Sequence, residues 1–306
     1  MPIASRLKGP AVALGGLYLA LWAGSTAYLA AKGADWTFPL ISLGIFGMAL
    51  SGLAVGLTRK ARPQPIPVRR PGLELAAILA FLAVYAVGFL GWGMGVVKDV
   101  FPPGREQELL VMAVKLLVHV VAPAVLLVLL GAKLRPLFRA GVSQPGFWPP
   151  LIVLAAILLA LVCVVSPALK EIGGLHVSTA TLAWAAPAAF IWYALEAGLC
   201  EEFLFRAVLQ SRLAAFLKTE AGAVAIGSLL FALAHAPGLY LRGAPDTDGW
   251  STDPVQVVAF TIATLSPIAI LFGTLWARTR SLLLIVLLHA AVDILPNLAE
   301  FVRTWA

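Results

Sequence analysis

The sequence predicts an all-α protein, a polytopic bundle of about nine transmembrane helices. Hydrophobic residues make up 61% of the 306 residues and charged residues only 12%, whereas soluble domains carry roughly 25% charged residues. The mean hydropathy is +0.94. Many apolar runs reach the ~20 residues that cross a hydrocarbon core of ~30 Å. Because no alternating barrel-strand pattern occurs, the spans are expected to be helices, which satisfy their own backbone hydrogen bonds in lipid.

Nine apolar segments are long enough to span, and eight or ten spans would also fit the pattern. The segments are residues 10–31, 37–57, 73–97, 108–131, 149–169, 180–203, 221–240, 255–277 and 281–298. Arg6 and Lys8 precede the first segment as in a signal peptide, but its length favours an uncleaved anchor. We divide the chain into an N-terminal membrane region of about five spans, residues 1–175, and a C-terminal core, residues 176–306.

The net charge of +7 does not indicate a nucleic-acid partner, because the basic residues are distributed through the loops between apolar segments. We expect the lipid bilayer to surround the chain instead. With the N-terminus in the cytoplasm, the inside segments hold fifteen Lys and Arg residues and the outside segments six. Cytoplasmic loops are enriched in these residues. The sequence therefore predicts a cytoplasmic N-terminus and a C-terminus outside.

The C-terminal core concentrates ionisable residues inside its spans, where each costs at least ~2.5 kcal/mol on insertion scales and so needs a partner or a purpose. Glu202 and Arg206 are one helical turn apart and are expected to face each other. The full set is Glu196, Glu201, Glu202, Arg206, His235, His289 and Asp293. Cys163 and Cys200 also lie in apolar segments, so neither a disulfide framework nor a CxxC metal site is expected.

Helix geometry predicts that Glu201 and His235 meet. Their midpoint in the sequence is residue 218, and residues 218–222 read KTEAG, which suits a turn. In an antiparallel hairpin both side chains lie roughly 25 Å from that turn and face each other at equal height. His289 lies about 14 Å beyond Arg280 by helix rise. We therefore expect the site in the cytoplasmic half of the bilayer, opening to that leaflet.

The strings EEFLFR, FALAH and HAAVD resemble the EExxxR, FxxxH and HxxxN/D motifs of the CPBP family of CAAX proteases and bacteriocin-processing enzymes, which includes the Ras-converting prenyl endopeptidase. The three motifs occur in the family's order, and the resemblance covers about Trp184 to Leu298. It implies an intramembrane endopeptidase whose substrate is a membrane-anchored or lipidated peptide or protein.

Glu201 is the expected general base, because a carboxylate and an imidazole that share a water molecule can activate it for peptide hydrolysis. His235 would hold that water, and Arg206 would orient Glu202. The resemblance implies that His289 and Asp293 stabilise the oxyanion of the tetrahedral intermediate. Because an ionised Asp293 would repel an oxyanion, it must be either protonated or a support for His289.

Two alternatives use the same residues. Glu201, His235 and His289 could bind zinc with one position open for water. The sequence contains no HExxH motif, so we favour metal-free hydrolysis without a cofactor. The chain could also be a non-catalytic immunity or scaffold protein of the same family, or a proton-coupled transporter, although it shows no internal repeat.

Four further residues carry weaker expectations. Lys115 and His119 are one turn apart and could form a proton path, but a lysine near a helix end is expected to extend to the membrane surface. Glu196 is expected either to line the cavity or to form a buried hydrogen bond. Phe231 is expected to pack beneath His235.

Overall fold

The computed structural model describes residues 8–306, and every regular element in this part of the chain is helical, with no strand. Nine of the described helices are long and apolar enough to cross a membrane, which confirms the predicted fold class. They are Gly9–Ala31, Thr37–Leu57, Pro71–Lys98, Arg105–Leu129, Trp148–Val165, Thr179–Leu217, Glu220–Arg242, Pro254–Thr279 and Leu282–Trp305. Arg6, which entered the topology prediction, lies outside the described residues.

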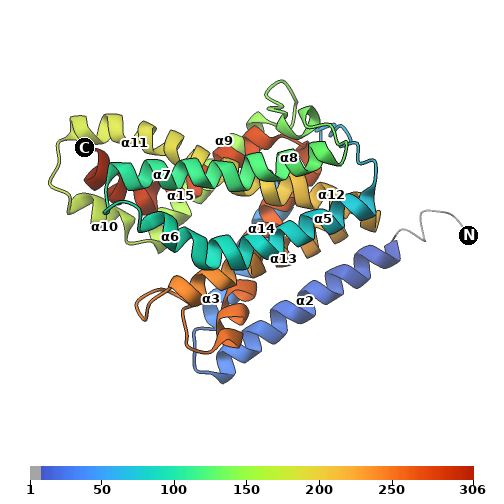
Figure 1. Ribbon diagram of the computed structural model, residues 1–306, viewed down its shortest axis with the longest axis horizontal. Helices are drawn as coiled ribbons and strands as arrows, with labels where there is room; N and C mark the ends of the chain where they lie inside the picture. The colour runs from blue at the N-terminus through green and yellow to red at the C-terminus, as the bar shows by residue number, and fades with distance from the viewer. Residues whose placement is uncertain (1–7) are drawn as a thin grey trace, which may run out of the picture.

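Several spans are built from more than one helical element (Figure 1). The N-terminal region contains α2 (Lys8–Ala31), α3 (Thr37–Ser42), η1 (Leu43–Leu50), α4 (Ser51–Leu57), α5 (Pro71–Val84), η2 (Tyr85–Gly93), α6 (Met94–Lys98), α7 (Arg105–Leu116), η3 (Leu117–Val121), α8 (Ala122–Leu129), η4 (Arg135–Phe138), α9 (Trp148–Val165) and α10 (Ala168–Gly173). The C-terminal region contains α11 (Thr179–Tyr193), η5 (Ala194–Leu199), η6 (Glu202–Gln210), α12 (Ser211–Leu217), α13 (Glu220–Arg242), α14 (Pro254–Thr279) and α15 (Leu282–Trp305). Element η4 is a 3₁₀ turn, and the other η elements are π-helical.

The sixth span is longer than expected, because α11, η5, η6 and α12 form one helix that ends at Leu217 rather than near residue 203. Arg206 and Arg212 interrupt the hydropathy pattern in this stretch, yet both are buried inside the protein. The helix stops at Lys218, which has a left-handed φ of 56°. Thr219 then caps α13 by accepting a hydrogen bond from the Gly222 N–H. The predicted turn at residues 218–222 therefore exists but is shorter than expected, because it consists of Lys218 and Thr219 and α13 begins at Glu220.

The last three spans form the centre of the bundle. Half or more of the residues in their most apolar stretches are buried within the protein, against 22% in the first, second and fifth spans. Helix α2 lies along the outside of α13 and α14 (Figure 1). The Trp22 indole donates a hydrogen bond to the Ala263 carbonyl at 3.0 Å, and the Tyr18 hydroxyl contacts Ser266 at 3.0 Å. The N-terminal spans thus surround a buried C-terminal core.

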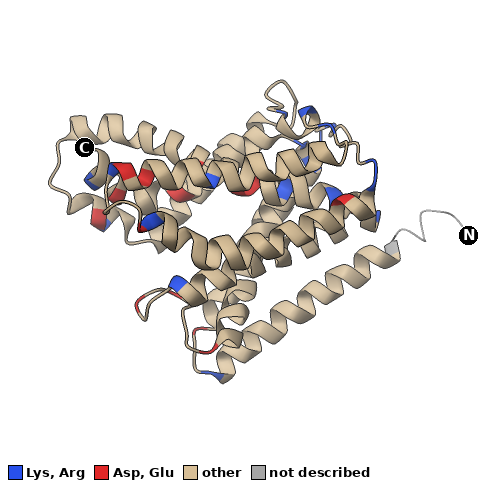
Figure 2. Ribbon diagram, in the orientation of Figure 1, with Lys and Arg blue, Asp and Glu red and all other residues tan. Residues whose placement is uncertain are grey.

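Basic residues gather at one end of the bundle, where α5 begins and α8 ends (Figure 2). We call this the basic end; the opposite end carries α10, the start of α11 and the C-terminus (Figure 1) and is called the C-terminal end. At the basic end Arg212 pairs with Glu74 at 3.2 Å, and neither side chain is exposed. Glu74 also accepts hydrogen bonds from the backbone N–H groups of Arg69 and Arg70. This buried pair fastens α5 to α12.

Candidate active site

The structure brings Glu201 and two histidines together from three helices. Glu201 lies between η5 and η6, His235 on α13 and His289 on α15. One carboxylate oxygen of Glu201 lies 3.9 Å from His235 Nε2, and the other lies 3.8 Å from His289 Nε2. A single carboxylate therefore faces two imidazoles, as the hairpin geometry predicted for the first of them.

The tautomer of His235 follows from its backbone contact. Its Nδ1 lies 2.8 Å from the Phe231 carbonyl oxygen, which can only accept a hydrogen bond, so Nδ1 carries the proton. In the neutral imidazole Nε2 then presents a lone pair toward Glu201. The 3.9 Å gap is too long for a direct hydrogen bond and suits a bridging water. Such a water could donate one proton to each group while its oxygen lone pairs face the cavity.

Glu202 connects Arg206 to His289. Its Oε1 accepts a hydrogen bond from His289 Nδ1 at 2.9 Å, and its Oε2 lies 3.3 Å from Arg206 Nε. The carboxylate of Glu202 and the guanidinium of Arg206 are both buried. The guanidinium also stacks over the Phe231 ring, 4.7 Å from its centre. Phe231 packs against His235 as well, with ring centres 4.6 Å apart, so one ring contacts both Arg206 and His235.

Asp293 lies one turn after His289 on α15. Its Oδ2 is 3.4 Å from His289 Nε2, the same nitrogen that faces Glu201. This contact places Asp293 as a neighbour of His289. Of the two roles set out for the aspartate, support of His289 matches this geometry better.

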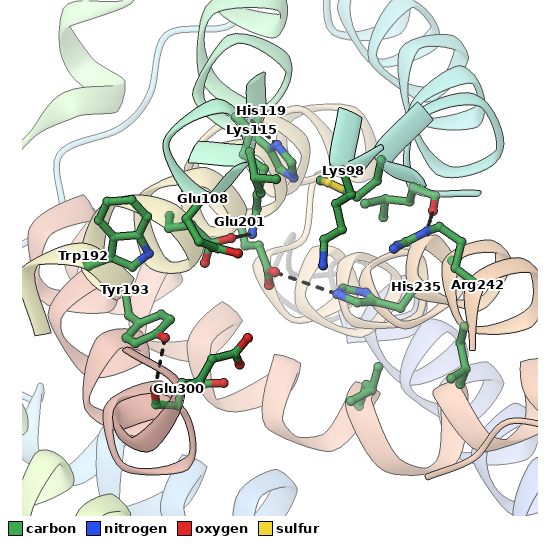
Figure 3. A pocket seen from close by; sticks show the side chains of 18 of the residues that line it. Lys98, Glu108, Lys115, His119, Trp192, Tyr193, Glu201, His235, Arg242 and Glu300 are labelled. Atoms are coloured by element: carbon green, nitrogen blue, oxygen red, sulfur yellow. Dashed lines mark hydrogen bonds and ion pairs between the residues drawn. The ribbon is translucent and has the colours of Figure 1, made fainter. Parts of the chain in front are cut away.

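A cavity of about 550 Å³ begins at Glu201 and His235 (Figure 3). Its lining continues to Lys98 and Arg242 and ends near Trp305 at the C-terminal end of the bundle. This differs from the expectation that the core opens toward the basic loops. Arg206 and Arg212, which follow Glu201 on the helix that runs to the basic end, are buried, and among the described residues none from the basic end lines this cavity.

The expectation that Lys115 extends to the membrane surface was wrong. Its ammonium group forms an ion pair with Glu196 in the lining of the cavity, and only 15% of its side chain is exposed. Glu196 meets both expectations, because it lines the cavity and accepts this hydrogen bond. The His119 Nδ1 donates to the Lys115 carbonyl oxygen at 2.8 Å, and its Nε2 accepts from the Tyr85 hydroxyl at 2.8 Å.

Several polar residues of the cavity were not found by sequence reasoning. Tyr85, Glu108 and Glu300 all line the cavity. An available signal was the position of Glu108 at the start of an apolar segment, where an acidic residue must face protein or water. Tyr85 carried no such signal, because tyrosines are common in membrane spans.

The zinc alternative has suitable donors, namely one carboxylate and two imidazole nitrogens. Among residues 8–306, however, no group of three or more His, Cys, Asp or Glu side chains has metal-binding geometry. Donors around a tetrahedral zinc with bonds near 2.1 Å lie about 3.4 Å apart, against 3.8 and 3.9 Å here. The arrangement as it stands does not fit the ion, and metal-free hydrolysis stays a prediction with zinc as its alternative.

One family model matches the chain, over residues 182–295, and is described as type II CAAX prenyl endopeptidase Rce1-like. The matched range contains all six predicted catalytic residues and none of the elements from α2 to α10. No curated protein and no solved structure matches the chain.

Proposed function

Residues 182–295 are a domain of the CAAX protease family, and from this premise we propose that the protein is an intramembrane endopeptidase in which Glu201 and His235 activate the hydrolytic water. The observation that carries the proposal is the 3.9 Å gap between the Glu201 carboxylate and the lone pair of His235 Nε2, at the inner end of a cavity. Both groups are able to accept a hydrogen bond there, which is the arrangement that would hold a water by its two protons.

In the proposed reaction, the water oxygen attacks the carbonyl carbon of the scissile peptide while Glu201 takes one water proton. The C–N bond then breaks, and the same proton passes from Glu201 to the leaving amine. The hydroxyl group of the water is then part of the new carboxylic acid and its other proton is on the new amine, and Glu201 is again a carboxylate. A general base contributes about 10²- to 10⁴-fold to such a reaction.

His289 is the proposed oxyanion donor. Glu202 accepts from Nδ1 at 2.9 Å, which fixes the ring so that Nε2 faces Glu201. An Nε2–H could donate to the developing oxyanion, and Asp293 at 3.4 Å would balance the charge of a doubly protonated ring. Arg206 in turn balances Glu202, so that the site does not hold an unpaired buried carboxylate.

The substrate we propose is a lipidated peptide at the membrane surface, cleaved near its C-terminus. The description of the matching family names a prenyl endopeptidase, and a cavity that reaches the site inside a membrane protein suits a peptide held at the bilayer. Leader peptides and C-terminal sorting helices are the other substrates that the proposed chemistry accommodates.

The test uses the full chain in lipid nanodiscs with three synthetic peptides: a farnesylated CAAX peptide, the same peptide without the lipid, and a hydrophobic leader peptide. Products are identified by mass spectrometry. We expect cleavage of the farnesylated peptide, with Glu201→Gln inactive. If no peptide is cleaved, or if Glu201→Gln cleaves as well as the wild type, the proposed function is wrong.

A further inference from the structure

Lys115 lies outside the matched domain, yet it reaches into the site. We infer that Lys115 is a positioning residue for Glu201, acting through Glu196, so that the N-terminal region completes the active site. This inference rests on the proposed function. It assigns to α7 a role in the reaction that the family match, limited to residues 182–295, does not cover.

The pair of Lys115 and Glu196 joins two helices that are distant in the sequence. Lys115 lies on α7, and Glu196 lies on η5 of the long helix that carries Glu201. Their side chains are only 15% and 17% exposed, and both line the cavity that contains Glu201 and His235. An unpaired charge at this depth is costly, so each group holds the other in place.

The position of Lys115 is itself fixed. One turn later on the same span, His119 is buried and donates a hydrogen bond to the Lys115 carbonyl oxygen. The other nitrogen of His119 accepts a hydrogen bond from Tyr85 on η2, which ties this turn to a third span. The ammonium group therefore projects from a backbone that has little freedom to move, unlike a lysine at a membrane surface.

Glu196 transmits this restraint to Glu201 along a π-helical segment. Glu196 lies within η5, and Glu201 follows two residues after the end of that element; the wider turn of π-helical geometry brings residues five apart nearer to one face of the helix. Both side chains consequently point into the cavity. A π segment has a wider turn than an α-helix, and a contact with a neighbouring helix restrains that turn. The ion pair supplies this contact one turn before the proposed base.

The cavity has an excess of carboxylates near the proposed base. Glu108, Glu196 and Glu300 line it together with Glu201; Figure 3 labels Glu108, Glu201 and Glu300. The Lys115 ammonium is the cation that directly contacts one of them. With Lys115 in place, Glu196 is neutralised and does not push the Glu201 carboxylate away from the water position. The neutralisation of Glu196 and the restraint of the helix by the ion pair therefore both keep the Glu201 carboxylate at the water position.

The experiment compares Lys115→Met with Lys115→Arg, Glu196→Gln, and the charge-reversed double variant Lys115→Glu/Glu196→Lys. The control is Lys170→Met, which removes an exposed lysine on α10 that does not line the cavity. For each variant kcat and KM are measured with the cleaved peptide. In parallel, hydrogen exchange of the backbone amides at residues 194–201 is measured by mass spectrometry, with residues of α14 as an internal reference.

We expect Lys115→Met to lower kcat by about 10- to 100-fold, the size of effect that follows a small misplacement of a reacting group, with little change in KM. Lys115→Arg and the charge-reversed variant should recover most of the loss. Exchange at residues 194–201 should become faster in Lys115→Met while exchange in α14 stays unchanged, and Lys170→Met should behave as wild type in both measurements.

An unchanged kcat in Lys115→Met would overturn the inference. So would a raised KM with an unchanged kcat, because it would assign Lys115 to substrate binding. The exchange measurement does not depend on activity: if no peptide is cleaved by the wild type, the proposed function fails, and unchanged exchange at residues 194–201 would then separately reject the positioning role.

Discussion

Removing one charge from the Glu202 and Arg206 pair should destabilise the protein more than removing both. The two side chains are buried, with 3.3 Å between Glu202 Oε2 and Arg206 Nε. Breaking a buried ion pair by removing one partner costs about 3–5 kcal/mol. Each survivor keeps one other contact, the His289 imidazole for Glu202 and the Phe231 ring for Arg206. A desolvated cation–π contact is worth about 2 kcal/mol.

Because of these retained contacts, we expect each single variant, Glu202→Gln and Arg206→Met, to lower the free energy of unfolding by about 3 kcal/mol, the lower end of that range. The double variant leaves no unpaired charge at these two positions and should cost less than either single variant. The assay is reversible unfolding of the purified protein in mixed detergent micelles with increasing dodecyl sulfate. If the cost of the double variant equalled the sum of the two single costs, the pair would not be an interacting buried unit and the reasoning would be refuted.

Three further predictions concern orientation, metal and acid. A cysteine at Gln64 should react with a membrane-impermeant label only after cells are opened, and a cysteine at Thr247 should react in intact cells; the reverse pattern would invert the predicted topology. The purified protein should be active in excess chelator, whereas stoichiometric zinc that is lost together with activity would establish the metal alternative. A hydrogen bond from Lys32 lowers the pKa of Asp253 to about 2. The ionised Asp253 should therefore contribute its full stabilisation above pH ~4 and lose it as the pH falls through ~2. The free energy of unfolding of Asp253→Asn should be lower than that of the wild type above pH ~4 and equal to it below pH ~2.

The spans and the hairpin turn could be predicted from the sequence because both follow from local properties. Apolar length fixes where a helix crosses a membrane. Helix rise then sets which residues of a hairpin share one height, which placed Glu201 opposite His235 with a turn at Lys218. The three motifs identified the residues that the structure brings together, and the family match covers the same range.

Features that depend on contacts between distant segments could not be predicted. Glu74 and Arg212 are separated by 138 positions, and Lys115 and Glu196 by 81. No local pattern indicates which charge in one span meets which in another. The end of the sixth span was misplaced for the same reason, because a buried arginine with a partner lowers hydropathy without ending a helix.

The π-helical segments around the site were also absent from the sequence-based expectations. Elements η5 and η6 flank Glu201, and such segments occur often at functional sites. Their register is set by packing of the long helix against α15 and α13, where the Gly198 position lies against the Val286 backbone. A hydropathy pattern does not contain that information.

The central claim is that the Glu201 carboxylate is the base that activates water. The most direct measurement is the single-turnover rate of peptide cleavage by Glu201→Gln, which keeps the size and hydrogen-bonding capacity of the side chain but removes its basicity. We predict a loss of at least about 10²-fold, the lower limit for a general base, with unfolding in dodecyl sulfate unchanged. A variant that folds normally and retains more than about a tenth of the wild-type rate would contradict it.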